Sequence, residues 1–179
     1  MKYLLLITLL IFTACSTKQV AYTLESNKVH AITSTKVQIG VKKIEVPEYL
    51  NSNKILVKEG NRIKELDANL ISTPDSLFTQ QAIILLKRKL NDPNVFLYPW
   101  DVKEQKGYIV AITIDDYLYS HGYVYLQGSY FIKQARGRTL VAKNFSFKRA
   151  SSNKADDIIK SLEELFTHLI DEIAQKIAR

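Results

Sequence analysis

The sequence contains little cysteine, glycine or proline. Its 179 residues include one Cys, six Gly and four Pro. A single cysteine excludes a disulfide scaffold, and the low glycine and proline content excludes collagen-like and low-complexity chains. With 46% hydrophobic and 24% charged residues, the composition is that of an ordinary globular protein. The length leaves room for one domain with its own core.

Groups that support catalysis or metal binding are scarce and scattered. The three histidines, His30, His121 and His168, have no spacing that would bring two of them to one metal ion. Asp115 and Asp116 are adjacent on an expected strand, so their carboxylates point to opposite faces and cannot form one acid–base pair. Neither a G-x-S-x-G nucleophile motif nor a glycine-rich phosphate loop occurs. We therefore predict a protein that is not an enzyme, with no catalytic residues, no cofactor and no metal site.

Positive charge is in moderate excess and is not concentrated. Lys and Arg number 25 against 18 Asp and Glu, which gives a net charge of +7. The basic residues form small clusters, whereas nucleic-acid binding requires a continuous basic stripe with aromatic residues that stack on bases. We therefore predict no nucleic-acid partner. Solvated faces account for such clusters, and attraction to anionic lipid headgroups is the functional alternative.

No apolar run is long enough to span a membrane. The run from Tyr3 to Ala14 has about twelve residues, against roughly twenty for a spanning helix. It follows the positive start Met1-Lys2 and precedes the one cysteine, as in a secretory signal peptide. The residues Phe12-Thr13-Ala14-Cys15 resemble a bacterial lipobox, with Phe where that pattern prefers Leu. We predict a lipoprotein signal peptide over 1–14 and lipidation of Cys15, so that acyl chains anchor the mature chain.

Lipidation would place the protein outside the cytoplasm, facing the periplasm. The alternative is an ordinary cleaved signal peptide with an incidental cysteine. Ser16 resembles the sorting signal of enteric bacteria, which favours the outer over the inner membrane and leaves the leaflet open. Residues 15–36 are predicted to comprise the lipidated cysteine and a flexible tether. As a random coil, about twenty residues would let the domain stand roughly 25 Å from the bilayer.

Alternating apolar and polar residues predict strands in the first half of the remaining chain. Residues 37–46 alternate with period two, and Pro47 ends the pattern because proline cannot donate to the sheet ladder. Residues 54–58 and 62–66 flank Glu59-Gly60-Asn61, which predicts a hairpin closed by a glycine-containing turn.

Two segments carry the apolar period of a helix. Thr73-Pro74-Asp75 combines a capping hydroxyl, a proline suited to the first helical position and an acid at the positive end of the helix dipole. From there, apolar residues recur at helical spacing over 77–90. Residues 158–177 form a clearer apolar stripe, which predicts a helix of about 25 residues extending roughly 37 Å.

The second half of the chain is rich in β-branched and aromatic residues. Residues 95–98 predict a short strand, and 108–119, 122–135 and 139–149 predict an antiparallel meander. Together these patterns predict an α+β fold: a single domain over 37–179 with a mostly antiparallel sheet packed against two main helices.

Several segments in order resemble a known family. They are the lipobox, Tyr22-Thr23-Leu24, the stretch from Ile39 to Leu50 with Val46-Pro47-Glu48-Tyr49-Leu50, the hairpin with Ile55-Leu56-Val57 and Asn61-Arg62, Tyr98-Pro99-Trp100 and the closing helix. This order is similar to the ABC-type transport auxiliary lipoproteins, the PqiC family, over nearly the whole mature chain. The segment from Leu66 to Leu70 departs from it, because members often carry a Trp and then an acidic residue, Pro and Leu there.

The resemblance implies a role as well as a fold. Such lipoproteins are non-enzymatic partners of an MCE-domain protein, and in some systems of an ABC permease and ATPase. These systems carry phospholipids or other hydrophobic molecules between membranes and support envelope integrity. Two alternatives stay open: an outer-membrane assembly lipoprotein for a β-barrel or secretin, and a stand-alone lipid-binding carrier. A homo-oligomer, the cargo and the direction of transport also stay open.

Two aromatic residues beside prolines are candidates for partner contact. Tyr49 follows Pro47 by two residues, and Trp100 directly follows Pro99. Exposed aromatic residues at the ends of loops often anchor protein partners. The alternative is that both side chains are lids on the core.

Overall fold

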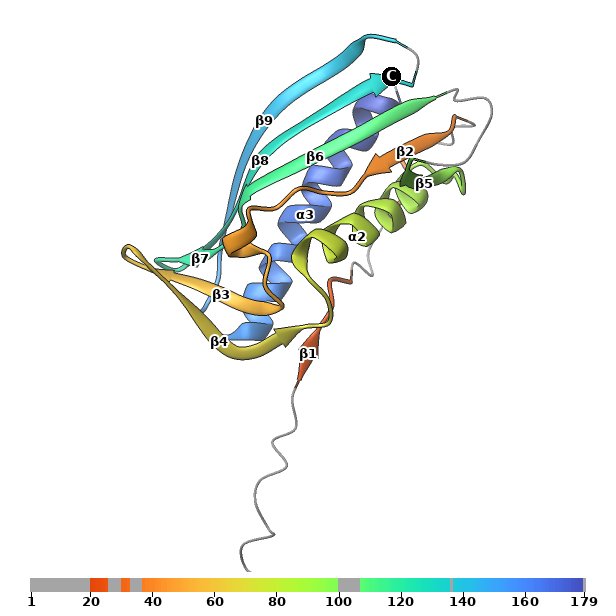
Figure 1. Ribbon diagram of the computed structural model, residues 1–179. Helices are drawn as coiled ribbons and strands as arrows, with labels where there is room; N and C mark the ends of the chain where they lie inside the picture. The colour runs from red at the N-terminus through yellow and green to blue at the C-terminus, as the bar shows by residue number, and fades with distance from the viewer. Residues whose placement is uncertain (1–19, 26–29, 33–36, 100–106, 136, 179) are drawn as a thin grey trace, which may run out of the picture.

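The structure is a computed structural model that describes residues 20–25, 30–32, 37–99, 107–135 and 137–178. Its elements in chain order are β1 (Ala21–Tyr22), β2 (Ile39–Lys42), the short 3-10 helix η1 (Glu48–Leu50), β3 (Lys54–Glu59), β4 (Arg62–Leu70), α2 (Pro74–Lys89), β5 (Val95–Tyr98), β6 (Tyr108–Asp116), β7 (Tyr119–Ser120), β8 (Tyr123–Gln134), β9 (Thr139–Ala150) and α3 (Ala155–Ile177). Figure 1 shows the strands as one curved sheet. The predicted single-domain α+β fold is confirmed.

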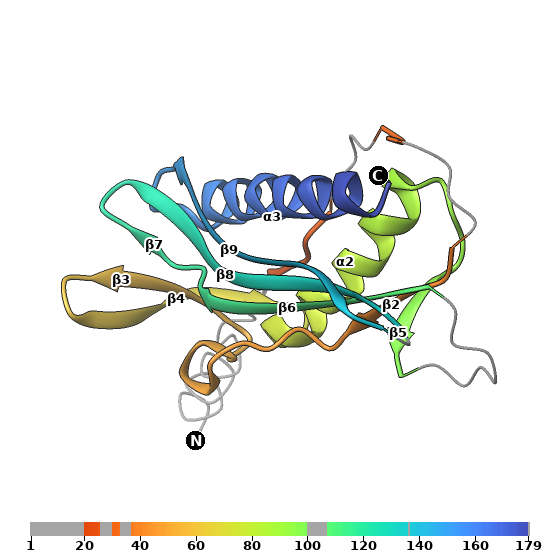
Figure 2. The same ribbon diagram turned by 90° about the horizontal axis from the view of Figure 1, so that it is seen from above.

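Helices α2 and α3 cover one face of the sheet, as Figure 2 shows from above. Helix α3 has 23 residues, and its apolar stripe is buried against β8, β9 and α2. Helix α2 has 16 residues and contacts β2 and β5 as well as α3. The predicted helices are therefore confirmed, because each stripe repeats at the helical period and finds an apolar surface to cover. No helix in the described part of the chain is long and apolar enough to cross a membrane.

The predicted hairpins are present. Strands β3 and β4 pair antiparallel, and Gly60 between them has a φ of 59°, a conformation that favours glycine. Strands β6, β8 and β9 form the expected antiparallel meander. Gly128 on β8 is required by close packing, because a Cβ there would lie 2.0 Å from the Thr113 carbonyl oxygen and 2.9 Å from the Phe145 ring.

The long pairs β3/β4, β6/β8 and β8/β9 are antiparallel, as predicted, and the sheet is mixed because it also contains parallel pairs. The strand order is β1-β4-β3-β7-β8-β6-β2-β5, with β9 added on β8. Strand β2 runs parallel to both β5 and β6, and the pairs β1/β4 and β3/β7 are parallel too. Period-two alternation shows which side chains face the core, but it carries no information on the direction of the neighbouring strand.

The start of α2 differs from the predicted cap. The Thr73 hydroxyl donates to the Asp75 carboxylate at 2.5 Å and does not cap a backbone amide of the helix. The Asp75 carboxylate itself accepts the Ser76 amide at 2.7 Å. One turn later, the Thr79 hydroxyl donates to the Asp75 carbonyl and accepts the Ile44 amide at 2.8 Å. These bonds tie the segment after β2 to the first turn of α2.

Polar contacts also hold α3 in place. The Lys89 ammonium on α2 lies 2.5 Å from the Asp171 carboxylate on α3, and the lysine is buried. The Glu172 carboxylate accepts the Tyr130 hydroxyl of β8 at 2.5 Å and the Lys143 ammonium of β9 at 2.8 Å. Charge-assisted bonds of this kind are stronger than neutral ones, so they give α3 one position over the sheet.

Residues 20–25 pack on the domain, although they lie within the range predicted as a flexible tether. Ala21 and Tyr22 pair in parallel with Asn69 and Leu70 at the end of β4. Leu24 is only 2% exposed and belongs to the core. The tether prediction is wrong for this segment, because a short apolar motif in a polar stretch can bury itself without any periodicity.

Candidate functional site

Tyr49 is presented at the surface by the short helix η1. Its side chain is 66% exposed, whereas the neighbouring Leu50 is fully buried. The Leu50 amide donates to the Pro47 carbonyl at 2.9 Å, which closes the turn directly after the proline. The alternative that Tyr49 is a lid on the core is therefore wrong.

Side chains from distant parts of the chain hold this turn. The Tyr117 hydroxyl donates to the Leu50 carbonyl at 2.5 Å, and the Tyr117 ring packs edge-on against Phe78 of α2. Burial raises the pKa of Tyr117, so the hydroxyl keeps its proton and remains a donor. The Asp75 amide donates to the Asn51 side-chain oxygen at 3.1 Å. The turn that carries Tyr49 is thus supported by both the sheet and α2.

The buried carboxylate of Asp75 lies next to the same turn. The Lys43 ammonium lies 2.6 Å from the Asp75 carboxylate, which also receives the bonds from Thr73 and Ser76. Burial alone would raise the pKa of Asp75, but the hydrogen bonds, led by that of Lys43, outweigh burial and lower the pKa to about 2. The carboxylate is therefore charged at neutral pH and fully engaged in holding the loop to the helix.

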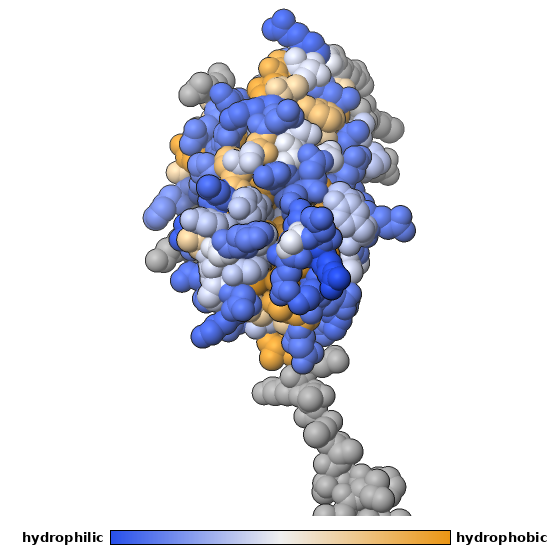
Figure 3. Space-filling model, turned by 90° about the vertical axis from the view of Figure 1, so that its left-hand side faces the viewer, coloured by the Kyte–Doolittle hydropathy of each residue, from blue (hydrophilic) through white to orange (hydrophobic). Residues whose placement is uncertain are grey.

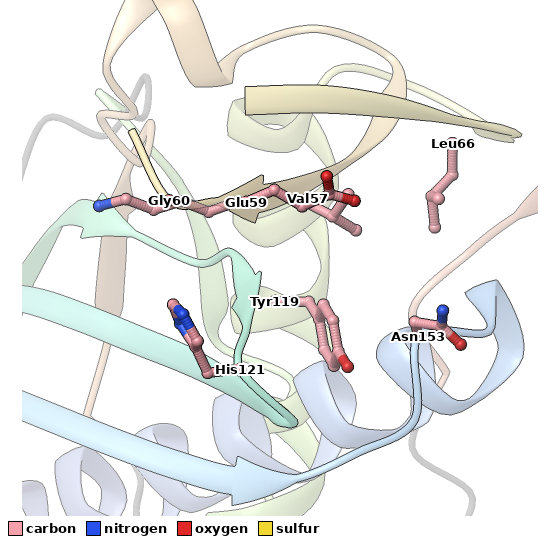
Figure 4. Close-up of a pocket in the computed structure, with 8 residues that line it drawn as sticks. Val57, Glu59, Gly60, Leu66, Tyr119, His121 and Asn153 are labelled. Atoms are coloured by element: carbon pink, nitrogen blue, oxygen red, sulfur yellow. The ribbon is translucent and has the colours of Figure 1, made fainter. Parts of the chain in front are cut away.

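A pocket of about 390 Å³ lies between the β3–β4 hairpin and β7. Figure 4 shows Tyr119 and His121 facing the β3 residues Val57 and Glu59 across it, with Asn153 at the far side. The volume is at the lower end of the usual range for small-molecule sites. The pocket is open to solvent and combines an apolar floor with a few polar groups.

The polar groups in this pocket do not form a metal site. His121 is exposed, and its Nδ1 lies 2.8 Å from the hydroxyl of its sequence neighbour Ser120. Within the residues that the structure covers, no group of three His, Cys, Asp or Glu side chains is placed to hold a metal ion. His168 instead packs edge-on against Phe147 at 4.8 Å between ring centres. Asp116 accepts the Leu118 amide at 2.9 Å, which is a structural role in the bend after β6.

The basic clusters are largely engaged within the protein. Lys43 and Lys89 bind carboxylates, Arg149 pairs with Glu164, and Lys148 lies 5.3 Å from the centre of the Tyr123 ring. This distribution fits solvated and structural charges better than one concentrated binding face.

Of the three candidate residues, the structure describes only Tyr49. Tyr49 is exposed as described, whereas Cys15 and Trp100 lie outside the described residues. Exposed apolar residues that sequence reasoning missed lie on the edge strand β5, where Phe96 is 42% and Leu97 is 52% exposed. Lys87 lies 5.5 Å from the centre of the Phe96 ring. The continuous apolar run Val95-Phe96-Leu97 gave no signal of its edge position, because a buried central strand has the same pattern.

Comparison with solved structures identifies proteins of the same fold. A crystal structure of an uncharacterized protein is 15% identical, with a TM-score of 0.71, and the match covers 89% of this chain and 98% of the other. A protein from Xanthomonas campestris is 12% identical, with a TM-score of 0.64 and coverage of 87% and 90%. At such low identities these similarities establish the fold alone. A search of curated proteins finds no significant match.

The sequence itself matches one family model. The model describes the ABC-type transport auxiliary lipoprotein component, and the match covers residues 22–174. It begins in β1 and ends in the last turns of α3, so it includes the described sheet with helices α2 and α3. The chain therefore belongs to the family of ABC-type transport auxiliary lipoprotein components.

Proposed function

We propose that this protein is the non-enzymatic, lipid-anchored component of an MCE/ABC-type system that moves phospholipids or other hydrophobic molecules between membranes and supports envelope integrity. The observation that carries the proposal is the family match over residues 22–174. In this role Cys15 bears the acyl anchor, and the folded domain faces the periplasm. The outer membrane is the preferred location.

The described surface is better suited to binding a protein partner than to catalysis. Tyr49 is an exposed aromatic on a turn held by Tyr117 and Asn51, so little conformational freedom is lost when a partner covers it. The partners in this proposal are an MCE-domain protein and the permease and ATPase of the same system. Trp100 remains a second candidate contact.

A pull-down from native membranes tests the proposal. The C-terminally tagged full chain is extracted in mild detergent beside three variants: Cys15→Ala, Tyr49→Ala and, as a matched exposed tyrosine, Tyr123→Ala. We expect recovery of an MCE-domain protein, reduced at least about tenfold by Tyr49→Ala and little changed by Tyr123→Ala, since a central aromatic contact contributes about 1.4 kcal/mol or more.

Other outcomes would support the alternatives. Recovery of a β-barrel or secretin without an MCE-domain protein would contradict the proposed partner and favour an assembly role. A stand-alone carrier would instead copurify with lipid, which native mass spectrometry of the detergent-extracted protein detects. Equal recovery with Tyr49→Ala and Tyr123→Ala would remove Tyr49 from the contact surface.

A further inference from the structure

The first described residues are held against the domain by several independent contacts. The Ile71 amide donates to the Tyr22 carbonyl at 2.8 Å, beside the β1/β4 pairing. Leu24 is buried, and its carbonyl accepts the Gln81 side chain of α2. The Glu25 amide donates to the Glu163 carboxylate of α3 at 2.6 Å. Residues 20–25 thus contact β4, α2 and α3. We call this segment the strap, because it crosses this end of the molecule.

The Tyr22 side chain adds a further tie. Its hydroxyl hydrogen-bonds to the Asp156 carboxylate at the start of α3, which raises the pKa of Tyr22. Because backbone bonds to β4 and the Tyr22 side chain both hold β1, the chain enters the folded domain at one defined place, Val20.

This entry point leaves little chain between the domain and Cys15. Only Ser16, Thr17, Lys18 and Gln19 separate Cys15 from Val20. At about 3.5 Å per residue, the fully extended chain from Cys15 reaches roughly 17 Å, and a random coil of that length averages about 12 Å. The earlier expectation of roughly 25 Å between domain and bilayer assumed a free tether up to residue 36 and is too long.

Apolar side chains are exposed where the strap meets β4. Val20 is 56% exposed, and Ile71, directly after β4, is 67% exposed. Figure 1 places β1 at one end of the molecule, and Figure 3 shows hydrophobic surface at that end.

We propose that the β1/β4 end of the domain, with Val20 and Ile71, lies against the surface of the membrane that holds the anchor. The opposite edge of the sheet, strand β5 with Leu97, then faces away from the bilayer. The inference rests on the proposed lipidation of Cys15 and goes beyond it, because it assigns the membrane-facing surface. The short connection between Cys15 and Val20 limits rotation of the domain relative to the bilayer. The exposed apolar residues favour contact with the membrane interface.

Depth-dependent fluorescence quenching tests this orientation. Lipidation consumes the thiol of the one native cysteine, so Ile71→Cys and Leu97→Cys each add a single thiol for a fluorescent label. The full lipidated chains are reconstituted in phosphatidylethanolamine–phosphatidylglycerol vesicles that contain a doxyl-labelled lipid. We expect at least about twofold greater quenching at residue 71, since its end of the domain stays within roughly 17 Å of the anchor. Both positions are exposed apolar residues, which makes them a matched pair.

A variant with a longer connection between Cys15 and Val20 provides a second test of the orientation. An insertion of about twenty Gly and Ser residues between Thr17 and Lys18 raises the average coil length to roughly 28 Å, and we expect the difference between the two labels to shrink. Equal quenching at both positions, or stronger quenching at residue 97, would overturn the orientation while leaving the anchor intact. If the labelled chains do not fractionate with membranes at all, the anchor itself fails and the orientation with it.

Discussion

At the scale of single residues, Asp75 connects helix α2 to two other parts of the chain. It joins Lys43, which follows β2, to the first turn of α2, and this junction supports the turn that carries Tyr49. Since a half-satisfied buried polar cluster is unfavourable, removal of one partner costs more than a surface ion pair is worth.

Replacement of Asp75 should make this cost visible in the pH dependence of stability. The folded-state pKa is about 2, below the ordinary 3.8, so the charged carboxylate stabilises the fold above about pH 4 and this contribution is lost as the pH falls towards 2. We expect Asp75→Asn to lower the free energy of unfolding by about 2 kcal/mol at neutral pH and by progressively less below about pH 4.

Urea unfolding at several pH values measures this effect. Asp115→Asn, which removes an exposed carboxylate on β6, is the matched control and should change stability by less than about 0.5 kcal/mol. A penalty for Asp75→Asn that is the same at pH 3 as at pH 7 would show that the charge has no part in it.

At the scale of elements, the shortest strand has a large effect on how the domain is connected. Strand β1 has two residues, yet its pairing with β4 and the burial of Leu24 decide where the N-terminal segment leaves the fold. Edge elements of this size are held by a few contacts, so they open locally before the rest of the domain unfolds.

Truncation of Leu24 should release the strap. We expect Leu24→Ala to remove about 2 to 3 kcal/mol of packing that holds the strap closed, and so to speed amide hydrogen exchange at Glu25 and Ile71 while α3 stays protected. Hydrogen exchange followed by mass spectrometry measures both regions in one experiment.

Val20→Ala is the control for this element. It changes an exposed residue of the same segment. We expect its free energy of unfolding to stay within about 0.5 kcal/mol of the parent protein and its amide exchange rates to stay unchanged. Uniformly faster exchange over α3 in Leu24→Ala would mean that the strap is an integral part of the global folding unit.

At the scale of the whole molecule, charge and lipid anchoring predict different behaviour. The net charge is +7, so electrostatic attraction to anionic headgroups is available even without acylation. Salt weakens that attraction, whereas several acyl chains, each contributing about 0.8 kcal/mol per buried CH₂, hold the protein regardless of salt.

Salt extraction of membranes separates the two modes of binding. We expect the parent protein to remain in the membrane fraction at about 1 M NaCl, where the screening length is about 3 Å, and Cys15→Ala to be released. Fractionation and immunoblotting of the tagged chains measure the split. Retention of Cys15→Ala under these conditions would contradict the acyl anchor as the main attachment.

The family resemblance, the two helices and the antiparallel meander followed from the sequence alone. These features depend on local spacing: the period of 3.6 in α3, the period of two in β8, and the turn at Gly60 are set by residues close together in the chain. Prolines and polar turns mark where such patterns end, so the limits of the two helices were close to those observed, whereas the strand predicted over 37–46 ends at Lys42 and the one predicted over 62–66 extends to Leu70.

Only the tertiary structure decided how these elements meet. The parallel pairing of β2, the bond between Tyr117 and Leu50 that leaves Tyr49 exposed, and the burial of Leu24 all join residues far apart in the chain. No local pattern encodes such contacts, because each depends on which surface the rest of the fold offers. The position of the membrane-facing end follows from the same kind of contact. Because the strap is docked on the domain, only a short connection remains between Val20 and Cys15.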